Sequence, residues 1–322
     1  MTTRASWSGL ARLALAGGCV AALACSGRSP ARDPDEPACT PGDPDCDPPA
    51  ACDLDSPGAP WLAFATAAAG SWDVAIARAD GTCRRSIVTD PGQDLYPTWS
   101  PAARIAFASD RSGSLGIWIH DLAAGTETRF DLGELRATYP AWSPDGTQLA
   151  FEGSLPGAAA SAIYLVAAEG GTPTPVTDGA AVDGAPAWAA DGSAIFFVSN
   201  RTGAYEVFSV SPAGGPTSQV THGSRIVGRP APSPDGAALA WARTGGGSTE
   251  VVRMSLATGL TEVVTSQGDS EPAYAPGAGG LAVRSYRHGA PEVLLLDAVT
   301  GDARVRLAPG VSAGSPSFQM IR

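Results

Sequence analysis

One segment recurs along this chain: it opens with proline, passes through a tight turn and enters an apolar strand. Clear copies read PAWSPDGTQLAF from Pro140, PAWAADGSAIFF from Pro186 and PAPSPDGAALAW from Pro230. Comparable segments are separated by 43, 46, 44, 42 and 44 residues and open at Pro97, Pro140, Pro186, Pro230, Pro272 and Pro316. A period of this length, with short strands between glycine-rich turns, is typical of β-propeller blades rather than helical repeats.

The period that opens at Pro140 contains a short strand with an aromatic residue, a turn, two apolar strands and a polar fourth strand, which predicts one four-stranded antiparallel blade. The 39 glycines and 28 prolines among 322 residues favour many tight turns over long helices. Asp145, Asp191 and Asp235 each precede glycine, so we interpret them as turn formers and not as catalytic acids. The copies after Pro97 and Pro272 lack Asp-Gly, and we expect weaker turns there.

Large aromatic side chains two residues after the prolines are expected to fill the wedges between neighbouring blades. They are Trp99, Trp142, Trp188, Tyr274 and Phe318. Six apolar second strands accompany six proline-aromatic strands, but the two sets are offset by one. The first blade therefore lacks an inner strand, and the chain ends on an unpaired one. The sequence predicts an all-β, six-bladed propeller over residues 61–322, in which the C-terminal strand, Pro316 to Arg322, closes the first blade.

The first 24 residues predict a signal peptide, with a basic leader followed by a short apolar run. Ala22-Leu23-Ala24-Cys25 resembles a bacterial lipoprotein signal, in which Cys25 becomes the lipidated first residue. The same three residues before Cys25 also satisfy the rule for ordinary secretory cleavage. A lipid-anchored protein and a freely soluble exported protein therefore both remain open.

Residues 25–60 predict a disordered tether, since residues 26–60 hold nine prolines, eight acids and almost no large apolar residue. Cys39, Cys46 and Cys52 lie in this segment, and Cys83 lies in the first blade. We expect disulfides, for which three pairings are possible. The alternative is a metal site, which is disfavoured because the C-x6-C-x5-C spacing without histidine does not match zinc ligation.

Charge and motif content exclude several function classes. A net charge of −11 argues against nucleic-acid binding, because phosphate contacts need a basic face. The chain has no G-x-S-x-G, H-E-x-x-H or D-x-D-x-D-G motif, and His120, His222 and His288 are isolated in sequence. We therefore expect no catalytic residue, no metal and no cofactor, and we predict that the protein is not an enzyme.

The candidate binding residues lie at one mouth of the propeller channel, just before the prolines. Asp94, Asp183 and Asp269 stand three residues before every second proline, and would form a three-cornered ring of carboxylates around the axis. The functional hypothesis is a site for a cation or a basic peptide segment. The alternative is that each aspartate accepts hydrogen bonds in its own loop. The predicted partner-binding residues are Asp94, Tyr96, Tyr139, Asp183, Arg225, Arg229, Asp269 and Glu271.

The PxWSPDGxxxAF motif resembles the repeat of the TolB family of six-bladed propellers over residues 61–322. SDRSG at Ser109 to Gly113 and SNRTG at Ser199 to Gly203 match the second hairpin of that family. The resemblance implies a non-enzymatic scaffold in the cell envelope, exported to face the periplasm or the cell surface. Its expected partner is an envelope protein or peptide, with membrane contact through the lipid anchor only.

The alternative function is a small-ligand receptor, or a hydrolase or lyase that uses the channel mouth. TolB-like propellers also occur on prolyl peptidases and in some polysaccharide lyases. The first would need a hydrolase domain, for which this chain has no residues left, and the second would need histidines gathered on the channel.

Overall fold

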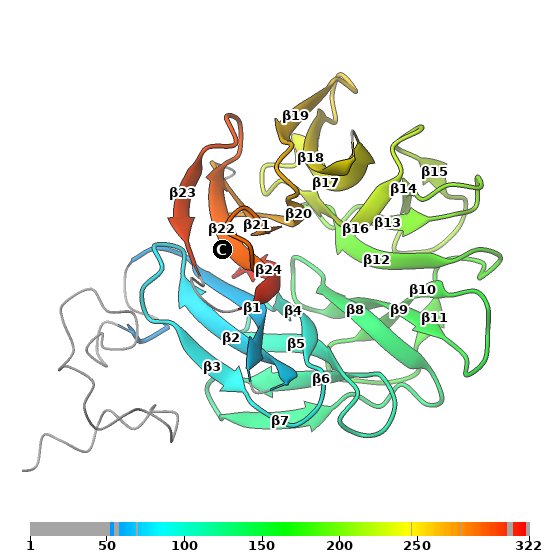
Figure 1. Cartoon of the computed structure of the whole chain (residues 1–322). Helices are drawn as coiled ribbons and strands as arrows, with labels where there is room; N and C mark the ends of the chain where they lie inside the picture. The colour runs from blue at the N-terminus through cyan, green and yellow to red at the C-terminus, as the bar shows by residue number, and fades with distance from the viewer. Residues whose placement is uncertain are drawn as a thin grey trace, which may run out of the picture.

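The computed structural model describes residues 52–54, 58–68, 70–245, 247–277, 279–307 and 312–319. Within those ranges the regular elements are 24 β-strands, which form six four-stranded antiparallel sheets around a common axis (Figure 1). The six-bladed propeller expected from the repeat is confirmed. The signal peptide, Cys25, Cys39 and Cys46 lie outside the described residues.

The blades are numbered in chain order, and their strands are given from the axis outwards. The first three blades consist of β24 (Ala313–Phe318), β1 (Trp61–Ala68), β2 (Ser71–Arg78) and β3 (Arg85–Val88); β4 (Leu95–Trp99), β5 (Arg104–Ser109), β6 (Gly116–Asp121) and β7 (Thr126–Arg129); and β8 (Arg136–Trp142), β9 (Gln148–Ser154), β10 (Ala162–Ala167) and β11 (Thr174–Pro175).

Blades 4 to 6 repeat this plan. They consist of β12 (Asp183–Trp188), β13 (Ile195–Ser199), β14 (Glu206–Val210) and β15 (Ser218–Gln219); β16 (Ile226–Pro232), β17 (Ala238–Gly245), β18 (Ser248–Ser255) and β19 (Thr261–Thr265); and β20 (Ser270–Tyr274), β21 (Gly280–Ser285), β22 (Glu292–Asp297) and β23 (Ala303–Arg306).

The ring closes through the C-terminal strand, as the strand offset predicts. β24 pairs antiparallel with β1, so that Leu62 faces Phe318 and Thr66 faces Ala313. In Figure 1 the red β24 lies beside the blue β1. The last three residues of the predicted closing segment lie outside the described part of the chain.

The hydrophobic core is divided into six clusters, one at each boundary between blades. Successive residues of one strand pack against opposite neighbours: Leu239 and Trp241 of β17 face blade 4, whereas Ala240 and Ala242 face blade 6. Both faces of a blade are therefore buried, which explains why these strands are almost continuously apolar.

The aromatic residues that follow the prolines lie in these interblade clusters, as predicted; they are Trp99, Trp142, Trp188, Tyr274 and Phe318. Blade 5 has Pro232 at the corresponding position. Trp241, from the next strand of the same blade, packs in the cluster between blades 4 and 5 instead.

The Asp-Gly turns have the structure expected of them. In blade 3 the Ser143 hydroxyl and the Thr147 amide both donate hydrogen bonds to Asp145, and Gly146 has a φ of 73°. Blade 2 has Ala103 where blade 3 has Gly146, and Ala103 adopts a φ of 54°. That turn therefore carries the steric cost that glycine avoids.

The end of the predicted tether packs against blade 1. A disulfide joins Cys52 to Cys83, with their Cα atoms 5.3 Å apart. Arg78 donates hydrogen bonds to the carbonyls of Asp53 and Ala59, at 3.0 and 2.9 Å, and its guanidinium lies over the ring of Trp61. A disulfide is thus confirmed between Cys52 and Cys83, and the pairing of Cys39 and Cys46 lies outside the described residues. No helix of the described residues is long and apolar enough to span a bilayer.

Candidate binding site on the propeller axis

Every inner strand carries an irregularity where it meets the axis. The pairing register between each inner strand and the second strand shifts at this point. In five blades the residue before the proline has a positive φ: Tyr96 at 56°, Tyr139 at 50°, Ala185 at 52°, Glu271 at 51° and Ser315 at 52°. In blade 5 Gly228 takes this conformation, at 77°. These bulges remove backbone groups from the ladder and redirect the neighbouring side chains.

Four of the predicted mouth residues come together here. Tyr96 and Tyr139 stack across the boundary of blades 2 and 3, with ring centroids 3.7 Å apart. The guanidinium of Arg229, from blade 5, lies 5.6 Å from the centre of the Tyr139 ring and donates a hydrogen bond of 2.9 Å to the Pro140 carbonyl. Arg229 therefore reaches across the axis from blade 5 to blade 3. We call Tyr96, Tyr139, Arg229 and Glu271 the axial belt.

Glu271 links blade 6 to blade 1. Its carboxylate accepts hydrogen bonds from the amide and hydroxyl of Ser315, at 2.5 and 3.3 Å, and lies 3.9 Å from Arg284. Glu152 plays a similar part between blades 3 and 4, where it accepts a hydrogen bond from the Ala185 amide, and burial raises the pKa of its carboxyl. In both cases a carboxylate satisfies the amide of a pre-proline bulge. The repeat motif gave no indication of Glu152, because its partner is a backbone group of the next blade.

Two residues of the axial belt, Tyr139 and Arg229, have pKa values shifted by burial. Burial is the largest cause that raises the pKa of the Tyr139 hydroxyl, and the nearby Tyr96 adds to it. Burial also lowers the pKa of Arg229, while Tyr139 and Glu271 act in the opposite direction. Both shifts disfavour charge, so the belt is an environment in which an added charge interacts strongly with its neighbours.

A cavity of about 400 Å³ lies on the axis, at the end of the inner strands that follows the prolines. All six blades line it through the equivalent segment of the inner strand, in which a small residue is followed by an aromatic residue in five blades and by Pro232 in blade 5. The small residues of that segment are Thr98, Ala141, Ala187, Ala231, Ala273 and Ser317. Among the described residues that line the cavity, Arg229 is the one with a charged side chain. Of the predicted mouth residues only Arg229 is among the described residues that line this cavity, which was not predicted from the sequence.

The three predicted aspartates are each occupied within their own blade. Asp94, Asp183 and Asp269 have no solvent-exposed side-chain surface. Each forms an ion pair with an arginine of the hairpin between the second and third strands: Asp94 with Arg111 at 2.9 Å, Asp183 with Arg201 at 2.8 Å and Asp269 with Arg287 at 2.5 Å. The partners Arg111 and Arg201 belong to SDRSG and SNRTG. These carboxylates are therefore neutralised locally rather than presented as an open ring.

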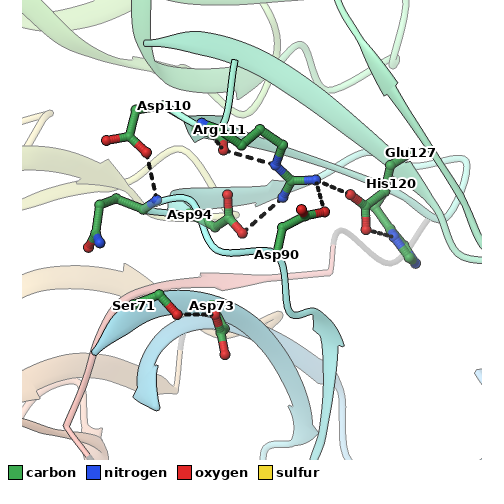
Figure 2. A network of polar contacts seen from close by, with 10 residues as sticks. Ser71, Asp73, Asp90, Asp94, Asp110, Arg111, His120 and Glu127 are labelled. Atoms are coloured by element: carbon green, nitrogen blue, oxygen red, sulfur yellow. Dashed lines mark hydrogen bonds and ion pairs between the residues drawn. The ribbon is translucent and has the colours of Figure 1, made fainter. Parts of the chain in front are cut away.

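Blade 2 extends this pair into a larger network (Figure 2). Arg111 contacts Asp90, Asp94 and Glu127, and Nδ1 of His120 lies 3.4 Å from Glu127. The network connects the linker before β4, the β5–β6 hairpin and β7, so it ties blade 2 to its incoming linker.

The remaining predicted residues do not converge with the belt. Arg225 is exposed, with a φ of 46°, and lies at the edge of blade 5. His120 and His288 contact glutamates of blades 2 and 6 respectively, and His222 is exposed between β15 and β16. None of the three histidines is among the described residues that line the axial cavity. The described part of the chain also holds no group of three His, Cys, Asp or Glu side chains arranged to bind a metal.

A family model described as the TolB beta propeller domain matches residues 116–319. This chain belongs to the TolB beta-propeller family. The structure of TolB from Acinetobacter baumannii superposes with a TM-score of 0.72 at 22% identity, over 81% of this chain and 67% of that one. A likeness at this identity establishes the shared fold.

Two curated relatives match shorter segments. The Tol-Pal system protein TolB of Bordetella pertussis is 28% identical over 149 residues, which cover 46% of this chain and 34% of that protein. The uncharacterized peptidase YuxL of Bacillus subtilis is 35% identical over 111 residues, which cover 34% of this chain and 16% of that protein. The matched segment thus spans about a third of the TolB relative and less of the peptidase.

Proposed function

We propose that this TolB-family propeller is a non-enzymatic binding protein of the cell envelope that presents one end of its axis to a protein or peptide partner. The axial cavity carries this proposal, because all six blades contribute to it and its walls are mainly apolar. A concave, mostly apolar site with a few convergent polar groups is the usual form of a binding site. Similarity to a Tol-Pal system protein supports a role in the envelope.

Partner binding is tested by cross-linking and affinity capture from native envelopes. Ala190 lines the cavity, and we expect Ala190→Arg to reduce capture by placing a bulky charge there. The matched control is Leu260→Arg, since Leu260 is 74% exposed on the outer edge of blade 5. Equal capture by the two variants, at unchanged melting temperature, would show that the axis is not the partner site.

Export and anchoring form part of the same proposal. The Cys52–Cys83 disulfide supports export, because disulfides persist in oxidising compartments. Cys25 lies outside the described residues, and its lipidation follows only from the sequence. We expect Cys25→Ser to move the protein from the membrane fraction to the soluble fraction. A wild-type protein that is already soluble would favour ordinary secretory cleavage.

A further inference from the structure

Arg229 is a cation without a counter-charge. Among the residues that the structure describes, no carboxylate oxygen lies within 4.0 Å of its guanidinium. The Nη2 group of Arg229 donates a hydrogen bond to the Pro140 carbonyl, whereas its Nε is buried without a hydrogen-bond partner. Glu271, the acid that acts on it electrostatically, is engaged by Ser315 and Arg284. A guanidinium stays protonated in proteins, so this site holds a desolvated positive charge that an incoming anion would compensate.

The cavity beside Arg229 is lined mainly by apolar residues. Prolines, alanines and aromatic rings make up most of its described lining, including Trp99, Trp142 and Trp188, and the non-aromatic polar side chains there, other than Arg229, are the hydroxyls of Thr98, Ser233 and Ser317 and the amide of Gln319. Its size comes from the residue after each proline, which is alanine in four blades, threonine in one and serine in one. A larger residue at any of these positions would occupy the axis. The cavity therefore suits an apolar body of modest size with a single negative end.

We propose that the axial cavity binds a carboxylate attached to an apolar body, with Arg229 as the counter-charge that recognises it. The planar guanidinium presents paired N–H donors whose spacing matches the two oxygens of a carboxylate. The carboxylate meets Arg229 at the inner end of the cavity, and the apolar body packs against the aromatic and proline walls.

Other ligand charges fit this cavity less well. A cation would meet Arg229 with no acid among the described lining residues to hold it, and burying that pair of like charges is costly. A phosphate dianion needs more donors than one guanidinium and apolar walls provide. A monoanion with an apolar neighbour uses both features of the site.

This inference rests on the proposed function in one respect: both place the binding site in the axial cavity. Two sources could supply the recognised chemistry: the carboxyl end of a peptide or protein, and a free organic acid. The probes are acetyl-Ala-Ala-Phe with a free carboxyl group, the same peptide as its amide, 3-phenylpropionate and 3-phenylpropionamide. Binding to the purified full chain is followed by tryptophan fluorescence and by calorimetry.

We expect both acids to bind at least about tenfold more tightly than their amides, because a hydrogen-bonded charge pair contributes on that scale. Arg229→Gln is expected to abolish this preference. Arg253→Gln, which removes a cation from β18 of the same blade outside the cavity, should retain it. Tighter binding of the peptide acid identifies a peptide carboxyl end as the ligand, and tighter binding of 3-phenylpropionate identifies a free acid.

Ala187→Leu keeps Arg229 and fills the cavity, so it tests the location even if Arg229→Gln does not fold. It should lose binding of both acids while melting like the wild type. Equal binding of acids and amides, no binding of either acid, or unchanged binding by Ala187→Leu would each overturn the inference. If acid binding fails while envelope capture succeeds, the carboxylate site is wrong and the proposed function is retained. If the acids bind and envelope capture fails, the carboxylate site is retained and the proposed function is wrong.

Discussion

Buried aspartates of alternate blades hold the linkers of the propeller in place. Asp183 is fully buried and accepts hydrogen bonds from Arg201 at 2.8 and 3.0 Å. Asp183→Asn would leave Arg201 without its counter-charge, and we expect a loss of about 3 kcal/mol in the free energy of unfolding. Asp178→Asn is the control, because Asp178 is 67% exposed and 3.9 Å from the same arginine; it should cost less than about 0.5 kcal/mol. Denaturant melts compare the two, and equal losses would contradict the ion-pair explanation.

Ala103 shows how one residue departs from the repeat. It occupies the glycine position of the first turn of blade 2, with a φ of 54° that costs a residue with a Cβ about 1–2 kcal/mol. Ala103→Gly should relieve that strain. Glycine also makes the unfolded chain more flexible, which offsets part of the gain, so we expect the free energy of unfolding to rise by about 0.5–1 kcal/mol. Ala102→Gly, one residue earlier and not at positive φ, should instead destabilise slightly. Thermal melting measures both, and a loss at Ala103 would contradict the strain.

At the scale of the element, turns of the same shape differ in what surrounds them. Gly259 and Gly301 end equivalent turns between the third and fourth strands of blades 5 and 6, with φ of 70° and 71°. A Cβ at Gly301 would lie 2.0 Å from the Val264 carbonyl, whereas a Cβ at Gly259 would meet nothing within 4 Å.

Gly301→Ala should therefore cost about 3 kcal/mol or more, since it adds a backbone clash to the left-handed conformation, while Gly259→Ala should cost only about 1 kcal/mol. Unfolding in urea distinguishes the two variants. Equal costs would show that the contact between blades 5 and 6 relaxes freely around Gly301.

The strands and turns could be predicted because their causes are local. Short apolar segments, Asp-Gly pairs and the spacing of the prolines are all read along the chain. The partner of Asp94 could not be identified in this way, although SDRSG was recognised as a hairpin, because nothing in the motif shows that Arg111 points back to the linker. The structure brings the four residues of the axial belt together, and that they bind a partner stays a prediction. The cavity was missed because it results from six small residues in six different blades, none of which indicates a cavity by itself.

At the scale of the whole molecule, stability depends on the joining of the two chain ends in blade 1. Deleting residues 316–322 removes half of β24 and Phe318, which is 7% exposed in the cluster between blades 6 and 1. Loss of one buried phenylalanine already costs about 3–5 kcal/mol, so the melting midpoint should fall by on the order of 10 °C. Phe318→Ala should reproduce a large part of the loss. An unchanged midpoint of the truncated chain would contradict closure of the ring through β24.

The pairing of Leu62 with Phe318 also has a consequence for the time course of folding. A chain emerging with its N-terminus first, from a ribosome or a translocon, exposes β1 long before its partner strand exists. The six blades cannot fold cooperatively as a closed ring until synthesis or translocation is almost complete. Blade 1 is therefore the first blade to be made and the last to be completed. Until then the open edge of β1 is free to pair with other chains, so the interval before closure is the period of greatest aggregation risk.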